Sequence, residues 1–269
     1  MARVHATRAI DQSRRHPVRG VGPDAPLRWL AAGWRDFMRC PGAGLAHGAA
    51  IAVFGLVLVA FGHRHFWGLS GAVSGFLLVA PILATGLYAI SAALERGERP
   101  TLRTALAAWR PNDGRLMLFG VLLAAAGTGW VMTSASLITT FASGPVNEPI
   151  DFARRVVLAE DSLLVEAWLM LGGVLAAPVF ASTVIAVPML MDRPVGVLAA
   201  VLTSWRVVLA QPFTMAVWAA TIASLTLAGL ITAMLGLVVI VPWLGHASWH
   251  AYRDLVGAPV GGSADGAQG

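Results

Sequence analysis

The chain has 269 residues, of which 57% are hydrophobic and only 12% are charged, and its mean hydropathy is +0.71. A soluble domain carries about twice that fraction of charged residues, so the composition excludes a soluble globular protein and indicates an integral membrane protein. All 19 basic residues are arginine, which makes the basic balance weak evidence for nucleic acid, and we expect no such partner. The single cysteine, Cys40, excludes an internal disulfide.

The two ends of the chain lack the pattern of a folded element. Residues 1–25 contain several arginines but no periodic apolar residues, so we expect a disordered, basic cytoplasmic tail. Its arginines can contact anionic lipid headgroups, at about 1 kcal/mol for each basic residue near the surface. Residues 256–269 are rich in Gly, Ala and Ser, and we expect them to be disordered as well.

A pattern of the form Leu-x-x-apolar-apolar-x-x-Trp-Arg occurs three times, beginning at Leu27, Leu102 and Leu198. Its apolar residues share one face of a helix, and each copy follows a proline, which suits a helix start. We therefore predict interfacial amphipathic helices at about 26–39, 100–110 and 195–209. Their interfacial anchors are the Trp–Arg pairs, which are Trp34-Arg35, Trp109-Arg110 and Trp205-Arg206.

The first of these helices has a clear division between apolar and charged residues. The apolar stripe, predicted to face the membrane, consists of Leu27, Leu30, Ala31, Trp34 and Met38. The charged residues, predicted to stay with water and headgroups, are Arg28, Arg35, Asp36 and Arg39.

Six apolar segments separate and follow these helices. About 20 residues are enough to cross the hydrocarbon core, so we predict transmembrane helices. They lie at about 44–62, 68–94, 116–141, 163–190, 213–230 and 235–252. The last two share one apolar run, Phe213 to Tyr252, which would make a single helix of ~60 Å. It must fold back, and we place the turn between Gly229 and Gly236.

The arginines predict the orientation. Most of the 19 precede the first span, lie between spans two and three or four and five, or follow span six. The outer connections hold only Arg64, Arg154 and Arg155. By the positive-inside rule both termini are cytoplasmic. The predicted fold is all-α, with six transmembrane helices arranged as three parallel repeats of an interfacial helix plus a transmembrane hairpin, in a bacterial inner membrane.

The repeat continues into the second span of each hairpin, which contains a proline: Pro81, Pro178 and Pro242. A small residue follows three positions later in each copy, and a polar residue four positions later (Ala84-Thr85, Ala181-Ser182 and Gly245-His246). Spans in lipid pack through small residues and interhelical hydrogen bonds. We therefore predict that these post-proline segments face protein rather than lipid.

Few residues could carry chemistry. His246 and His250 share one helix face, and with His47 they could hold a metal or a haem; the alternative is a structural role. Glu166 could form an intramembrane polar site with Thr85, Ser182 and His246, or could lie at the outer interface. No nucleotide-binding loop, Ser/His/Asp motif or nucleophile elbow is present, so we expect neither catalysis nor a cofactor.

Across residues 26–256 the sequence resembles a bacterial family of predicted inner-membrane proteins classed as a domain of unknown function. The resemblance rests on four segments, which are Leu27–Asp36, Leu94–Pro100, Leu190–Arg193 and Gly245–Asp254. Some such proteins are labelled cytochrome c oxidase subunit I. That label fits poorly, because the haem and copper histidines of the oxidase have no counterpart here.

The resemblance implies no established activity. We expect a non-enzymatic scaffold or assembly partner that contacts the lipid bilayer, anionic headgroups and other membrane subunits. The alternative is a transporter of a small solute or lipid, and a haem- or metal-binding protein is a third hypothesis. A water-accessible cavity between spans two, four and six would favour the transporter, whereas a filled interior would favour the scaffold.

Overall fold

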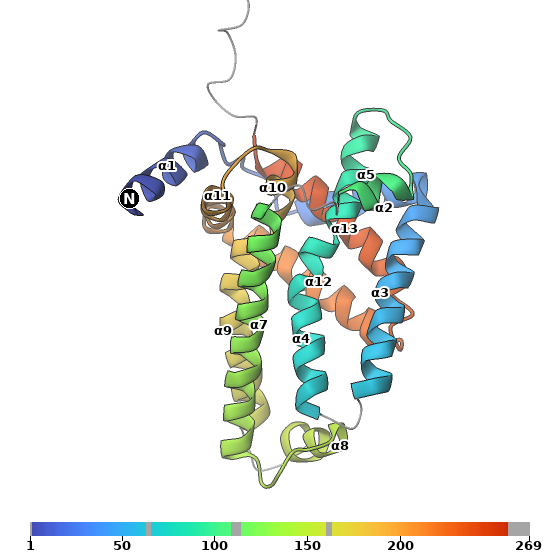
Figure 1. The fold of residues 1–269 in the computed structure, drawn as a ribbon, viewed down its shortest axis with the longest axis vertical. Coiled ribbons are helices and arrows are strands. Elements are labelled where there is room, and N and C mark those ends of the chain that lie inside the picture. Colours follow the sequence, from blue (N-terminus) through green and yellow to red (C-terminus); the bar gives the residue numbers. More distant parts are fainter. Residues whose placement is uncertain (1, 63–65, 109–113, 160–162, 258–269) are drawn as a thin grey trace, which may run out of the picture.

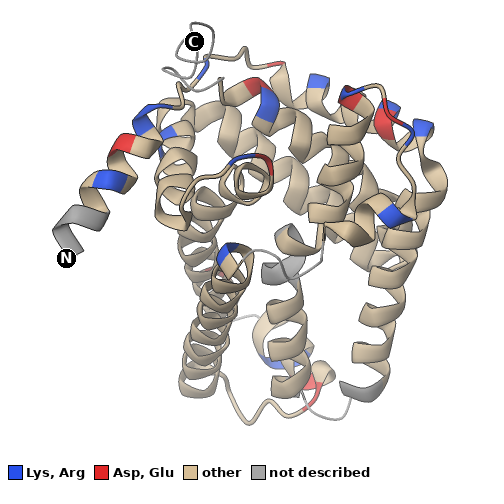
Figure 2. Cartoon of the chain, turned by 45° about the horizontal axis from the view of Figure 1, so that its top comes forward, with Lys and Arg blue, Asp and Glu red and all other residues tan. Residues whose placement is uncertain are grey.

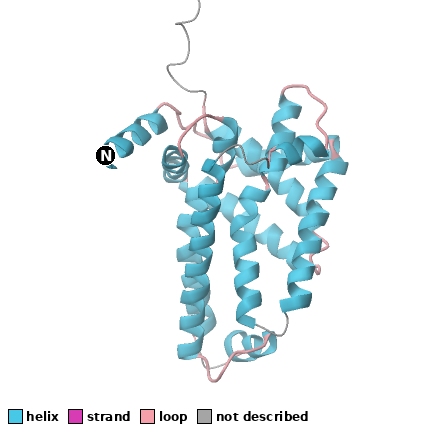
Figure 3. Ribbon diagram, viewed as in Figure 1, coloured by secondary structure: helices cyan, strands magenta, loops and turns pink. Residues whose placement is uncertain are grey.

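The computed structural model describes residues 2–62, 66–108, 114–159 and 163–257. Within these ranges the chain forms helices and loops and no strand (Figure 3), apart from one isolated antiparallel bridge between Val18 and Val256. The predicted all-α class is therefore confirmed.

The helices follow the predicted order of interfacial and apolar segments. They are α1 (Ala2–Arg14), α2 (Ala25–Arg39), α3 (Pro41–Gly62), α4 (Phe66–Leu83), α5 (Thr85–Glu95), α6 (Leu102–Ala107), α7 (Gly114–Phe141), α8 (Pro149–Phe152), a π-helix η1 (Ala153–Val157), α9 (Leu164–Thr183), α10 (Ala186–Asp192), α11 (Val197–Ala210), α12 (Pro212–Ile231) and α13 (Leu237–Leu255).

Among the described residues, four helical segments are long and apolar enough to cross a membrane: Pro41–Ala60, Gly114–Phe141, Leu164–Asp192 and Pro212–Ile231. They coincide with predicted spans one, three, four and five. Span two corresponds to α4 with α5 and span six to α13, and both stay predictions. Figure 1 shows α3, α4, α7 and α9 along the long axis of the molecule, with α12 and α13 running obliquely to them.

Charged residues gather at the two ends of the molecule, and the helices between them are almost free of charged residues (Figure 2). Most of the charges lie at the end that carries α1 and α2. Large apolar side chains are exposed along the intervening helices, among them Met132 at 68%, Met170 at 72% and Ile231 at 76% exposed. Such a surface suits a lipid environment, because apolar side chains exposed to lipid tails carry no free-energy penalty of the kind that water would impose.

The largest buried core lies toward the charged end. It joins α2, α5, α10, α11, α12 and α13, and its largest fully buried members are Trp218, Trp249 and Tyr252. Trp29 of α2 packs edge-on against Trp218 of α12, with ring centroids 5.4 Å apart. The post-proline segments belong to this buried region, since most residues of α5, α10 and the second half of α13 are buried. The prediction that they face protein is confirmed.

Predicted span two is not one helix, because α4 ends at Leu83 and α5 begins at Thr85. The hydroxyl of Thr85 donates a hydrogen bond of 2.7 Å to the carbonyl of Ile82. This local bond competes with the regular backbone ladder, which is how a threonine interrupts a helix. The single helix expected from hydropathy is therefore interrupted at Ala84.

Predicted span four is also interrupted, between Thr183 and Ala186. Pro188 has no N–H and cannot donate to the carbonyl four residues earlier, so the helix cannot continue regularly through Val184. The backbone N–H of Ile185 instead donates to the Ser204 hydroxyl of α11 at 3.2 Å. In contrast, α13 continues through Pro242. The copies of the predicted repeat thus differ in this detail, and the repeat itself stays a prediction.

The turn between α12 and α13 lies where the sequence places it, after Ile231 and before Leu237. Ala233 and Met234 adopt positive φ angles of 51° and 66°, which reverse the chain. The Thr232 hydroxyl accepts the N–H of Gly236 at 3.0 Å and so closes the turn.

The prediction of a disordered tail at 1–25 is wrong for its first half, which forms α1. Ala9 and Ser13, four residues apart, are buried, and α1 packs on α11. The hydroxyl of Thr203 in α11 donates to that of Ser13 at 3.0 Å, and the Arg206 guanidinium donates to the Ser13 carbonyl at 2.7 Å. Tertiary contacts order a segment that has no strong apolar pattern.

The start of the predicted C-terminal tail is also held in place. Val256 pairs with Val18, and the N–H of Gly257 donates to the carbonyl of Pro17 at 2.9 Å. The prediction for residues 258–269 falls outside the described part of the chain. The segment after α1 and the segment after α13 therefore meet, at residues 17–18 and 256–257.

Candidate functional site

A buried polar cluster joins three helices that are far apart in sequence: Asp36 of α2, Ser91 of α5, and His246 and His250 of α13. Asp36 is 5% exposed, and Ser91 and His246 are fully buried. We call these four residues the Asp36 cluster. They lie in the region where α2, α5 and α13 pack together.

The carboxylate of Asp36 is the acceptor at the centre of this cluster. Its Oδ2 accepts a hydrogen bond from the Ser91 hydroxyl and another from Nε2 of His250, both at 2.8 Å. The Ser91 oxygen in turn accepts the Nδ1 proton of His246, also at 2.8 Å. With the Nδ1 proton of His246 donated to Ser91, Nε2 of the neutral imidazole carries no proton. Its lone pair has no hydrogen-bond partner among the described residues.

The position of Asp36 contradicts the sequence prediction that this residue stays with water. The buried face of α2 consists of Ala25, Pro26, Trp29, Gly33, Asp36 and Phe37. The opposite face, with Leu27 at 71%, Trp34 at 40% and Met38 at 51% exposed, points away from the protein, as predicted. Because α2 has apolar residues on both faces, periodicity alone did not reveal that one face packs on α13.

Glycine at position 33 lets α2 and α13 approach closely. A Cβ built there would lie 2.8 Å from the Cα and Cβ atoms of Ala247. The side chain of Trp29 donates to the Asp254 carboxylate at 2.9 Å, and that of Trp243 donates to the Leu30 carbonyl at 2.8 Å. These contacts hold the backbone of α2 against α13 and so fix Asp36 beside the two histidines.

The hydrogen bonds to Asp36 affect its ionisation. Burial is the largest influence and raises the pKa, but the hydrogen bonds from His250 and Ser91, with the nearby imidazoles of His250 and His246, outweigh it. The net result is that the pKa of Asp36 lies below its ordinary value of 3.8. The cluster therefore stabilises the carboxylate form.

This shift predicts how stability depends on pH. A depressed carboxyl pKa contributes stability above the unfolded value of 3.8, and that contribution is lost as the pH falls through the folded value. We expect the thermal midpoint of the wild type to exceed that of Asp36→Asn near neutral pH, and the gap to narrow below pH 3.8. Circular dichroism in detergent measures both midpoints. A gap that stayed constant down to pH 3 would contradict the assignment.

The three histidines do not converge on a metal. His246 and His250 bind Ser91 and Asp36, and Nε2 of His47 is 2.8 Å from the carbonyl oxygen of Leu83. Among the described residues, no group of three or more His, Cys, Asp or Glu side chains is placed to hold a metal ion. The i, i+4 spacing correctly predicted that His246 and His250 share one helix face, but His250 binds the Asp36 carboxylate and His246 reaches it only through the Ser91 hydroxyl.

The four residues of the predicted intramembrane polar site are not brought together. Glu166 is exposed in the first turn of α9 and so lies at the far end of that helix from α10. Thr85 donates to the Ile82 carbonyl, and the Ser182 hydroxyl accepts the indole N–H of Trp205 at 2.9 Å. His246 belongs to the Asp36 cluster. The structure thus favours the outer-interface alternative for Glu166.

The predicted Trp–Arg anchors have different surroundings. Trp34 packs edge-on against Trp243, and Trp205 is 36% exposed. Arg35 is exposed, but Arg206 donates to backbone carbonyls of Ser13 and His16, which contradicts a role for it at the headgroups. Trp109 and Arg110 fall outside the described residues.

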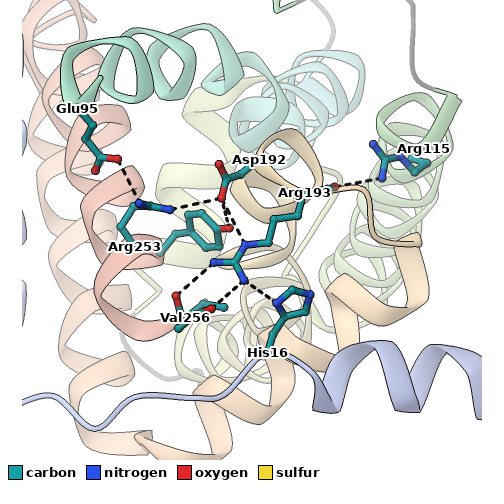
Figure 4. A network of polar contacts seen from close by, with 9 residues as sticks. His16, Glu95, Arg115, Asp192, Arg193, Arg253 and Val256 are labelled. Atoms are coloured by element: carbon teal, nitrogen blue, oxygen red, sulfur yellow. Dashed lines mark hydrogen bonds and ion pairs between the residues drawn. The ribbon is translucent and has the colours of Figure 1, made fainter. Parts of the chain in front are cut away.

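A second polar network lies at the same end and was missed by sequence reasoning, which treated its residues only as charged stops. Asp192 accepts the phenolic proton of Tyr252 at 2.6 Å and forms ion pairs with Arg193 and Arg253. Arg253 also pairs with Glu95 at 3.2 Å (Figure 4). This network, which we call the Asp192 network, ties α5, α10 and α13 together.

Arg193 extends this network to both ends of the chain. It donates to Nδ1 of His16 at 2.5 Å, to the Gly257 carbonyl at 2.8 Å and to the Val256 carbonyl at 3.4 Å (Figure 4). Its own carbonyl accepts a hydrogen bond from Arg115 of α7 at 3.3 Å. These contacts hold the helices in position. Within the Asp36 cluster and within this second network, most of the polar groups are hydrogen-bonded or ion-paired to one another.

Residues 69–192 match a family described as a predicted integral membrane protein, DUF2189. The expected relationship to a membrane family of unknown function is thereby confirmed. The match runs from α4 to α10 and so includes Ser91 and Asp192 but not Asp36 or His246. Comparisons with curated proteins and with solved structures gave no match.

Proposed function

We propose that this chain, whose residues 69–192 match an integral membrane family, is a non-enzymatic scaffold or assembly partner in a bacterial inner membrane. The surface through which it contacts its partners is the collar, which we define as α2, α6 and α11. Both termini lie on the cytoplasmic side, as the distribution of arginines favours. The partners are bilayer lipids, including anionic ones, and other membrane-protein subunits.

The observation that carries this proposal is a row of exposed apolar residues on each collar helix. On α2 it is Leu27, Trp34 and Met38; on α6 it is Leu102 and Leu106; on α11 it is Leu198, Trp205 and Leu209. Each row has helical spacing and lies opposite residues that pack on the protein. Exposed apolar rows at a polar end of the molecule suit an interface with lipid or with another subunit.

The polar groups of the same end support a structural rather than a chemical role. The Asp36 cluster and the Asp192 network use their carboxylates to hold α2, α5, α10 and α13 in place. The collar is therefore presented on a rigid support, which favours defined contacts.

Photo-crosslinking in cells tests the proposal. A photoreactive amino acid placed at position 34 or 205 is expected to give protein adducts of discrete mass, because these side chains face outward from the collar. The matched control is Met132 on α7, which is 68% exposed along a predicted span and is expected to give lipid adducts alone. Mass spectrometry identifies the products. Lipid adducts alone at all three positions would contradict the scaffold and leave only membrane anchoring.

A further inference from the structure

The end of the molecule that holds the Asp192 network contains a cavity of about 460 Å³. Its walls come from three segments that are distant in sequence: residues 12–19 after α1, residues 192–195 between α10 and α11, and residues 253–256 at the end of α13. The Val18–Val256 bridge and the contacts of α1 with α11 bring these segments together. The cavity is therefore a product of the fold and not of any local motif.

The charge of its lining is strongly positive. Arg15, Arg19, Arg193 and Arg253 contribute to the walls, and Asp192 is the only carboxylate among the described residues that line it. That carboxylate already accepts the proton of Tyr252 and pairs with two of the arginines. His16, also in the lining, is held neutral, because burial and then the charges of Arg193 and Arg206 lower its pKa from 6.5.

The four arginines fall into two groups. Arg193 is fixed, since its side chain is only 9% exposed and is hydrogen-bonded to His16, Val256 and Gly257. Arg253 forms ion pairs with Glu95 and Asp192. Arg15 and Arg19 are exposed, and the described residues offer no acceptor to either guanidinium group. The cavity thus combines a fixed positive wall with two arginines whose side-chain donors have no acceptor among the described residues.

We propose that this cavity binds a phosphate group, with Arg15 and Arg19 as its direct ligands and Arg193 as a fixed positive charge behind them. The forked donors of arginine match phosphate oxygens in pairs, and such charge-assisted bonds are the stronger ones. The volume is in the range of small-molecule sites, and basic pockets at the cytoplasmic side of membrane proteins take lipid headgroups. The phosphate belongs either to an anionic phospholipid or to a soluble phosphorylated compound. This inference goes beyond the scaffold proposal and does not depend on it.

The test uses the full chain in a nonionic detergent and compares Arg15→Ala/Arg19→Ala with Arg8→Ala/Arg14→Ala. Both variants lose the same charge from the same region, but Arg8 and Arg14 do not line the cavity. Native mass spectrometry follows binding of phosphatidylglycerol, with phosphatidylcholine as the zwitterionic reference. Thermal midpoints follow binding of inorganic phosphate and glycerol 3-phosphate at constant ionic strength.

We expect at least one phosphate probe to bind the wild type and the control variant equally, and to bind the cavity variant about tenfold or more weakly. Selective retention of phosphatidylglycerol identifies a lipid headgroup, and binding of the soluble probes identifies a free phosphorylated compound. Because the exposed side chains of Arg15 and Arg19 make no hydrogen bonds with described residues, and alanine keeps the backbone bonds, the midpoint without ligand is expected to be unchanged. Equal losses in the two variants, or no binding of any probe by the wild type, would overturn the proposal.

Discussion

Replacing Asp36 by alanine is expected to destabilise the protein by about 3 kcal/mol or more. The change removes the acceptor for both the buried Ser91 hydroxyl and Nε2 of the partly buried His250, and so leaves two donors without their partner. Each such donor costs about 1–3 kcal/mol, and breaking a buried charged cluster costs about 3–5 kcal/mol. The free energy of unfolding can be measured by titrating the protein in mixed micelles with a denaturing detergent and following its circular dichroism.

The matched control is Asp24→Ala, which removes a carboxylate just before the same helix. Asp24 is exposed and pairs with Arg28 on the surface, where solvent screens the interaction. We therefore expect little change for this variant. If Asp36→Ala and Asp24→Ala had similar effects, the Asp36 cluster could not be what holds α2 to α5 and α13. Ser91→Ala should lie between them, because it removes one donor and leaves His250 bonded to Asp36.

Replacing Gly48 by alanine is expected to cost about 2 kcal/mol, a large effect for the addition of one methyl group. A Cβ at position 48 of α3 would lie 2.8 Å from the Cα of Val238 in α13 and still closer to its carbonyl group. Backbone atoms cannot rotate away, so α3 and α13 would have to separate. Small residues at such crossings are what allow helices to pack in lipid.

Gly129→Ala is the matched control for this second prediction. Gly129 lies in the predicted span α7, and a Cβ added there has no neighbour within 4 Å. Alanine is the better helix former, so the control is expected to be neutral or slightly stabilising. Unfolding measured under the same conditions compares the two. If both changes were neutral, the close approach of α3 and α13 would be contradicted.

The elements that sequence reasoning located well are those defined by local patterns. The interfacial helices predicted at 26–39 and 195–209 are α2 and α11 to within two residues at each end, because proline starts and helical periodicity are properties of adjacent residues. The turn between α12 and α13 was located by length alone, since an apolar helix of that size would exceed the hydrocarbon thickness. The short second helix, α6, was only partly accounted for, because Trp109 and Arg110 fall outside the described residues.

The interruptions of the long spans were harder to foresee. Three prolines at matching positions suggested one behaviour for three spans, yet α13 continues through Pro242 while the second and fourth spans break. The breaks depend on other residues: the back-bonding hydroxyl of Thr85, and Pro188 with Ser204. Whether a freed backbone group finds a partner depends on the neighbouring helix, and a repeat in sequence does not determine it.

The candidate site was predicted only in part. The spacing of His246 and His250 correctly indicated a shared helix face, but their partner Asp36 was assigned to water. One signal was available: Asp follows the Trp–Arg pair in the first copy of the motif and in neither of the others. From the sequence, the charged residues of the Asp192 network were interpreted only as markers of the ends of transmembrane spans. Its partners come from α5, α10, α13 and residue 16, and no spacing rule connects them.

By itself, the sequence determined that this is a helical membrane protein, and it located the four long apolar helical segments and the helices α2 and α11 to within a few residues. Those properties follow from hydropathy and periodicity, which act between near neighbours. Only the tertiary structure decided which face of α2 is buried, that His250 binds Asp36 while His246 binds Ser91, and that residues 12–19 and 253–256 line one arginine-rich cavity. The physical reason is that a polar side chain bonds to whatever lies within about 3 Å, and packing alone sets that distance for residues far apart in sequence.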